Sequence, residues 1–156
     1  MPVNRIWQDE PIVAHAQVLA RSFKRFTQRD LLAGIFSAAE FSGKLFDAPF
    51  VLVSHGIQAD PVLNYGNRAA LALWEMSWDE FTRTPSRLTA EAPRREERAR
   101  LLETVARHGF IDNYSGIRIS KSGRRFEIFQ ATVWSLVSEA GEPCGQAATF
   151  SEWKFL

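Results

Sequence analysis

The chain has 156 residues, of which 46% are hydrophobic and 24% are charged, and its formal net charge is +1. This length and composition are typical of one folded domain and exclude a disordered or fibrous protein. The balanced charge argues against direct nucleic-acid binding through bulk electrostatics. The longest apolar run, residues 69–74, is far shorter than the roughly 20 residues of a membrane-spanning helix, so no membrane segment is predicted.

The N-terminal composition and the cysteine usage both indicate a cytoplasmic protein. Residues 1–11, MPVNRIWQDEP, lack the basic, apolar and small-residue progression of a secretory signal. Cys144 is the only cysteine, which excludes an intramolecular disulfide and a multi-cysteine metal site and agrees with a reducing compartment.

The first third of the chain is predicted to be helical. Residues 11–27 place apolar side chains at alternating steps of four and three, the stripe of an amphipathic helix. A second helix is expected over residues 31–47, with Asp30 as its N-cap and Pro49 beyond its end. The stripe of the first helix fits a homodimer interface, but packing within the chain uses the same pattern.

Two short strands and two short helices should follow. Residues 50–55 and 61–66 are β-branched or aromatic runs separated by the turn-like GIQAD. Asn67 stands where its side chain can cap a helix over residues 68–74. Ser77 and Glu80 form a Ser-x-x-Glu capping box, which predicts a second short helix running through Phe81.

The remainder predicts one longer helix and an antiparallel meander. The helix covers residues 93–107, begins at Pro93 and is closed by Gly109 as a left-handed C-cap. Three strands are expected at residues 110–120, 124–138 and 144–153, joined by the turns KSG and EAGEP.

The hairpin register decides which side chains share a face of the sheet. A two-residue turn at Ser122-Gly123 would place Arg118 opposite Glu127, and a bulged three-residue loop is the alternative. With the two-residue turn, one face carries a polar island composed of Asn113, Ser115, Gln130 and Thr132. The other face is apolar through Phe129, Ala131, Val133 and Val137. We expect the N-terminal helices or a second subunit to cover that apolar face.

This order of elements is that of a PAS domain, and four segments are more specific. They are SHGIQADPVLNYGNRAALALWEMSWDEF, PSRLTAEAPRREERARLL, GFIDNYSGIRISKSGRRF and CGQAATFSEW. Over about residues 50–153 these segments resemble the MEKHLA family, whose PAS-like domain ends the plant class III homeodomain–leucine zipper transcription factors and also occurs as a separate bacterial protein.

The resemblance implies a PAS-like α+β fold with a five-stranded antiparallel sheet and short helices on one face. The residue pattern adds two N-terminal helices, so we expect an N-terminal helical extension, residues 1–49, packed on the sheet or on a partner subunit, and a PAS-like domain, residues 50–156. In PAS domains the short helices cup a cavity against the sheet. Our hypothesis is that Asn113, Ser115, Gln130 and Thr132 line this cavity, with Trp74 or Trp134 as a flat apolar wall. Cross-strand hydrogen bonds or simple exposure of the four polar residues is the alternative.

Catalytic and metal chemistry is not indicated. His15, His55 and His108 lie in three separate elements without the spacing of metal ligands. Some PAS proteins bind haem from the helix before the meander, but His108 beside Gly109 is better explained by the helix dipole. The reactive cysteine of flavin photoreceptors, expected on the helix after Asn67, is missing.

Adjacent polar residues have structural explanations too. Ser54 and His55 should point to opposite faces of a strand, which does not suit nucleophilic catalysis. The pairs Asp79-Glu80 and Glu96-Glu97 stand near helix starts, where negative charge offsets the dipole. The arginines of residues 94–100 and 124–125 are predicted to lie on a solvated helix face and a hairpin end rather than in a nucleic-acid patch.

We therefore expect a sensory or regulatory module that binds a small-molecule ligand or a regulatory protein and performs no catalysis. One alternative is a small pocket enzyme using general acid/base chemistry on an apolar substrate, which a buried ionisable side chain facing the cavity would favour. The other is a pure protein-interaction or dimerisation domain, which a filled core would favour.

Overall fold

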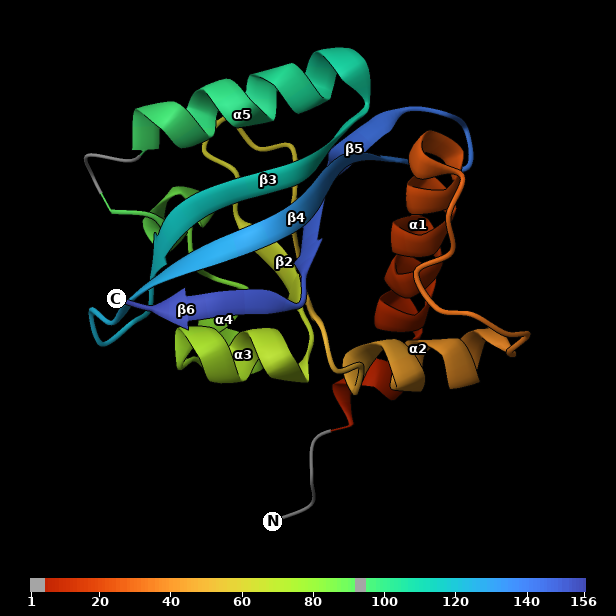
Figure 1. Ribbon diagram of the computed structural model, residues 1–156. Helices are drawn as coiled ribbons and strands as arrows, with labels where there is room; N and C mark the ends of the chain where they lie inside the picture. Colours follow the sequence, from red (N-terminus) through yellow and green to blue (C-terminus); the bar gives the residue numbers. More distant parts are fainter. Residues whose placement is uncertain (1–4, 92–94) are drawn as a thin grey trace.

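The computed structural model describes residues 5–91 and 95–156 (Figure 1). The helical elements are η1 (Ile6–Gln8), α1 (Glu10–Thr27), α2 (Ala38–Phe46), α3 (Arg68–Trp74), α4 (Trp78–Phe81), η2 (Ser86–Thr89) and α5 (Arg95–His108). The strands are β1 (Val51–His55), β2 (Leu63–Gly66), β3 (Phe110–Ile119), β4 (Arg125–Val137), β5 (Pro143–Phe150) and β6 (Glu152–Phe155). Pro93, the expected start of the long helix, lies outside the described residues.

The strands form one antiparallel sheet in the order β2-β1-β5-β4-β3. The predicted α+β class and antiparallel PAS-type sheet are confirmed. Within the described residues the sheet has six strands rather than five, because the strand predicted at residues 144–153 breaks at Ser151. The piece beyond the break, β6, pairs with the first half of β4, and β5 pairs with its second half.

Helices cover both faces of this sheet (Figure 1). The apolar stripe of α1 packs against β4 and β5, where Ala16 and Leu19 have no exposed surface. We call this the outer face, and its centre is the edge-to-face contact of Phe23 with Trp134, at 4.8 Å between ring centroids. The helices α3, α4 and α5 lie over the opposite, inner face. The stripe that fits a homodimer interface is therefore buried against the chain's own sheet.

The second predicted helix is wrong at its start. The segment from residue 31 to 37 is irregular, and α2 begins only after Ser37, whose hydroxyl accepts from the Glu40 backbone N–H at 3.2 Å. Ser37 and Glu40 have the same Ser-x-x-Glu spacing as Ser77 and Glu80, and this spacing is a stronger start signal than Asp30.

The predicted two-residue turn between β3 and β4 is also wrong. Three residues, 121–123, separate Ser120 from Arg124, whose carbonyl accepts from the Ser120 N–H at 2.9 Å, and Gly123 has a φ of 89°. This is the bulged three-residue loop, in which glycine readily takes the left-handed conformation. The register shifts by one residue, so Arg118 lies opposite Phe126 and not opposite Glu127.

Two bulges farther along the hairpin change the faces again. Asn113 and Gln130 both have left-handed backbone, with φ of 56° and 51°, and the β3–β4 register shifts on either side of Tyr114. A bulge adds one residue to a strand and reverses the alternation beyond it. Consequently Ala131 packs on the inner face with the residues under α3, and Trp134 packs on the outer face under α1.

Candidate functional site

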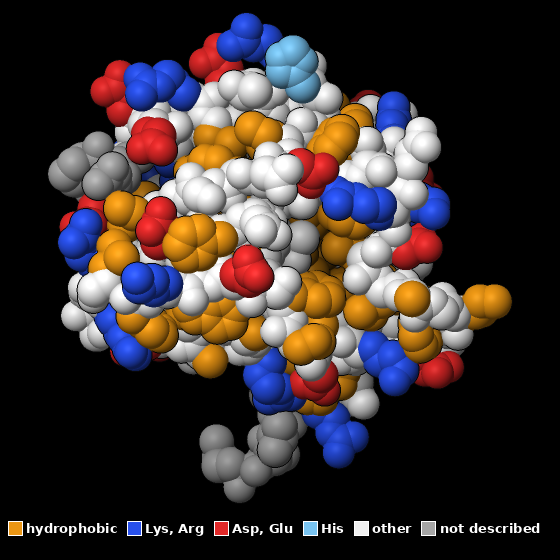
Figure 2. Space-filling view, viewed as in Figure 1, with side chains coloured by type: hydrophobic (Ala, Val, Ile, Leu, Met, Phe, Trp, Pro, Cys, Tyr) orange, Lys and Arg blue, Asp and Glu red, His pale blue; other side chains and the backbone are white. Residues whose placement is uncertain are grey.

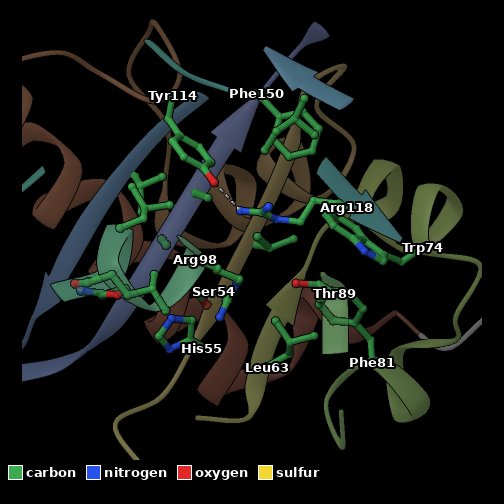
Figure 3. Close-up of a pocket in the computed structure, with 18 residues that line it drawn as sticks. Ser54, His55, Leu63, Trp74, Phe81, Thr89, Arg98, Tyr114, Arg118 and Phe150 are labelled. Carbon is green, nitrogen blue, oxygen red and sulfur yellow. Dashed lines mark hydrogen bonds between the residues drawn. The ribbon is translucent and has the colours of Figure 1, made fainter. Parts of the chain in front are cut away.

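A cavity of about 60 Å³ lies between the inner face of the sheet and the helices α3, α4 and α5 (Figure 3). The sheet and the inner helices both contribute to its wall. The apolar lining residues are Val53, Leu63, Trp74, Phe81, Leu101, Leu102, Ile128, Val133, Ala147, Ala148 and Phe150. The polar lining residues are Ser54, His55, Thr89, Arg98, Tyr114, Arg118 and Gln146.

The short helices that close the cavity are held by their caps. Asn67 is fully buried, and its Oδ1 accepts from the backbone N–H groups of Ala70 (3.2 Å) and Leu52 (3.1 Å). Its amide donates to the carbonyls of Phe50 (2.8 Å) and Leu45 (3.3 Å). This one side chain thus joins the start of α3 to β1 and to the end of α2.

Caps at the end of α3 and at the start of α4 let the chain bend after only two turns of helix. Glu75 ends α3 with left-handed backbone, and Ser77 and Glu80 form a reciprocal capping box at the start of α4. The α4 side chain Phe81 then packs on Gly66, so closely that a Cβ on this glycine would lie 2.7 Å from the ring. The bend after α3 therefore brings Trp74 and Phe81 to the same cavity wall.

Arg118 on β3 is the most buried charged group of the cavity. Its side chain is 7% exposed and donates to the Ile117 carbonyl at 2.8 Å and to the Tyr114 hydroxyl at 3.3 Å. Figure 3 shows the Tyr114 hydroxyl and the Arg118 guanidinium pointing toward each other. Both partners are neutral, so they do not compensate the positive charge.

Arg98 on α5 brings a second guanidinium to the same cavity and is half-buried. Burial, with a smaller contribution from the charge of Arg118, lowers the pKa of Arg98 to about 10, which leaves it charged at neutral pH. From the sequence, Arg98 is predicted to lie on a solvated helix face with the other arginines of residues 94–100. One of these, Arg94, lies outside the described residues.

His55 on β1 adds a polar atom without a partner. Its side chain is 8% exposed, and its Nδ1 lies 2.9 Å from the Gly56 carbonyl, which makes Nδ1 the protonated nitrogen. The buried Nε2 has no hydrogen-bond partner among the residues that the structure describes. Burial lowers the pKa of His55, the Gly56 carbonyl opposes this, and the charge of Arg98 lowers it further.

The structure does not bring the predicted polar island into this cavity. The side chains of Asn113, Ser115 and Gln130 are exposed. Thr132 is buried at 7% exposure on the outer face, where its hydroxyl donates to Asp112 at 2.7 Å. Gln130 and Thr132 line a second, shallower hollow beside the loop after α1. The bulges explain the error, because they turn Tyr114 and Ala131 inward in place of the island.

The two tryptophans are also separated. Trp74 lines the cavity, whereas Trp134 lies on the outer face against Phe23. Gly109, with a φ of 90°, follows the last residue of α5, and His108 is exposed beside it.

A signal for Arg118 was present in the sequence: Gly123 after Lys-Ser is typical of the three-residue loop that places Arg118 on the inner face.

Other chemistry-bearing residues lie away from the cavity or have their hydrogen bonds satisfied. Cys144 is half-buried and packs with the outer cluster. The Ser54 hydroxyl donates a hydrogen bond to Asn64 at 2.5 Å and lies 2.9 Å from His15 Nε2. Its proton and one of its acceptor sites are therefore already used within the protein. In the part of the chain that is described, no group of His, Cys, Asp or Glu is arranged to hold a metal ion. No described helix is long and apolar enough to cross a bilayer.

Comparison with known proteins gives one family and many structures of one fold. The family model of the MEKHLA domain matches residues 13–155, a wider range than the segments that carry the sequence resemblance. The match begins inside α1, so it includes most of the outer helical layer. No curated protein matches the chain in sequence.

Solved structures similar to the chain include PAS and light-oxygen-voltage domains. The PAS domain of a protein from Colwellia psychrerythraea is 14% identical, with a TM-score of 0.63, over 77% of this chain and 98% of that one. The photo-excited blue-light photoreceptor Vivid is 14% identical, with a TM-score of 0.58, over 86% and 94%. An RNA-binding light-oxygen-voltage receptor is 17% identical, with a TM-score of 0.60, over 78% of this chain and 35% of that one. These likenesses concern the fold.

A flavin, the group named for one light-oxygen-voltage domain of this fold, does not fit the cavity described above. Pockets for drug-sized ligands measure roughly 300–1,000 Å³, whereas this cavity measures about 60 Å³. The rings of Trp74 and Phe81 are part of its wall, 6.2 Å apart between centroids. The space therefore suits a molecule of only a few heavy atoms.

Proposed function

The chain belongs to the MEKHLA domain family, and we propose that it is a regulatory module that binds a small ligand in the cavity under α3, α4 and α5. The observation that carries this proposal is the cavity itself, because the helices α3, α4 and α5 and the strands β1 to β5 all contribute side chains to its wall. A ligand there contacts α5 through Arg98 and β3 through Arg118, so its presence changes how firmly the helices are held on the sheet.

Ionisable groups at a cavity are also typical of a pocket enzyme, which is the alternative function. General acid/base catalysis requires a group whose pKa lies near the working pH. Among the described residues that line the cavity there is no Asp or Glu, and both arginines stay charged at neutral pH. His55 is held to Gly56 and lacks an orienting carboxylate. This composition supports binding without catalysis.

The exterior gives no support to nucleic acid as the partner. Basic and acidic side chains are interspersed over the face shown in Figure 2. On the exposed side of α5, Arg100 pairs with Glu96 at 3.2 Å and Arg107 pairs with Glu103 at 3.4 Å. Strong phosphate binding needs basic groups gathered on one surface. We therefore assign the regulatory output to a protein contact.

Native mass spectrometry of the purified full chain tests the proposal, with an ultraviolet–visible spectrum to detect a chromophore. We expect a bound small molecule that is released on unfolding. The variant Ala148→Leu fills the cavity and should lose this molecule, whereas Ala140→Leu, in an exposed turn, should retain it. A protein that carries no bound mass, and whose Tm does not respond to a panel of small metabolites, would contradict the proposal.

A further inference from the structure

Two guanidinium groups without acidic partners face one small, mainly apolar cavity, and from this we propose that the ligand is a small monocarboxylate held by Arg98 and Arg118. The inference rests on the proposed function, because it names the chemical class that the same cavity takes.

The charge of the ligand follows from the missing counter-ions. All 18 acidic residues of the chain lie in the described ranges, and none pairs with Arg98 or Arg118. By contrast, Arg100, Arg107 and Arg125 each contact a glutamate. Placing an uncompensated charge in a protein interior is costly, and the charge of Arg118 even lowers the pKa of Arg98. An anion between the two removes that cost.

The donors around the cavity suit a carboxylate. Two bonds of Arg118 are taken by Ile117 and Tyr114, which fixes the orientation of its guanidinium and leaves further N–H groups for a ligand. Arginine binds the two oxygens of a carboxylate with two parallel hydrogen bonds. The Tyr114 ring also lies 5.5 Å from the Arg118 guanidinium carbon, which holds the side chain in place.

The size and the apolar walls distinguish a carboxylate from phosphate. A volume of about 60 Å³ holds roughly four to six water-sized groups, at about 10–15 Å³ each. Most of the remaining wall consists of apolar side chains, among them Leu63, Phe81 and Phe150. A phosphate carries oxygens on every side and would leave some of them against these walls without donors. A short carboxylic acid presents one charged end and one apolar end, which suits a wall made of two guanidinium groups and mainly apolar side chains.

Calorimetric titration of the full chain with sodium propionate tests this assignment. We expect a dissociation constant of about 1 mM or tighter. The neutral isostere propionamide, and inorganic phosphate, should bind at least about tenfold more weakly.

Variants identify the two arginines as the binding groups. Arg98→Met and Arg118→Met should each weaken propionate binding at least about tenfold. The matched controls are Arg100→Met on α5 and Arg125→Met on β4, which should bind as the unmodified chain does. If Arg118→Met does not fold, Arg118→Lys serves in its place. It keeps the positive charge but loses the two parallel N–H donors of the guanidinium, and it should weaken propionate binding less than about tenfold.

Three outcomes would overturn the assignment of a monocarboxylate ligand. They are no propionate binding, equal binding of propionamide, or tighter, arginine-dependent binding of phosphate. The carboxylate assignment can fail while the proposed ligand-binding function still holds, and the two results can be told apart. If propionate does not bind, but native mass spectrometry still finds a molecule that Ala148→Leu loses, the cavity is a ligand site for another class of compound. If neither is seen, the ligand-binding function itself fails.

Discussion

The two faces of the central sheet are built from different chemistry. Under α1 the outer face is packed with apolar side chains around Phe23 and Trp134, and Leu136 beside them has no exposed surface. The inner face instead retains a cavity and two guanidinium groups without acidic partners in the described chain. Burying charge without compensation lowers stability, so the outer face supplies the stability that the inner face gives up.

The largest expected effect is on the outer face. Trp134→Ala should lower the free energy of unfolding by about 3–5 kcal/mol, because it removes a fully buried indole and leaves a cavity under α1. Urea unfolding measures the loss. Phe155→Ala, at a residue that is 38% exposed, is the control and should cost less than about 1 kcal/mol. Equal losses for the two variants would contradict the division into a stabilising outer and a functional inner face.

Asn67 tests the connection between the two faces. Asn67→Ala should cost about 3 kcal/mol, since it removes four hydrogen bonds of a fully buried side chain, among them the one that the buried N–H of Leu52 donates. Ser77→Ala removes an exposed cap and should cost about 1 kcal/mol in the same urea experiment. If both variants lose the same stability, Asn67 acts only as a cap of α3.

Buried histidines should make stability depend on pH. Burial lowers the pKa of His15 on the outer face to about 4 and also lowers the pKa of His55 on the inner face. The unfolded chain therefore binds more protons, and stability should fall as the pH drops from about 6.5 toward 4, by up to about 3 kcal/mol for His15.

Unfolding by urea at pH 7, 5.5 and 4.5 measures this dependence. His15→Gln should flatten the profile, and His108→Gln, at an exposed residue, should leave it unchanged. An unaltered slope in His15→Gln would show that other groups cause the acid sensitivity.

The smallest expected change in stability comes from the inner face. Arg118→Met should leave the free energy of unfolding within about 1 kcal/mol of the unmodified chain or raise it, because it replaces an uncompensated buried charge with an apolar side chain of similar length. Thermal unfolding with and without propionate measures the effect. A loss of about 3 kcal/mol would mean that Arg118 is part of the structural core and would remove the contrast between the faces.

Much of the fold was predictable because its signals are local. The stripe in residues 11–27 corresponds to α1, and the motifs at Asn67 and at Ser77-Glu80 stand at the starts of α3 and α4. The start of α2 was missed although Ser37 and Glu40 carry the same capping signal, since the apolar residues before them suggested an earlier start. The break at Ser151 has no local signal of its own; it lies beside the bulge of β4 at Gln130.

The sequence by itself determined the order of the elements, their capped ends and the amphipathic helix that covers one face of the sheet, because propensity, capping and periodicity act over a few residues. Only the tertiary structure decided which side chains face the cavity. A three-residue turn ending at Gly123 and single bulges at Asn113 and Gln130 each move the strands by one residue, and one residue exchanges the two faces. Arg118 thereby reaches the cavity, and the predicted polar residues do not.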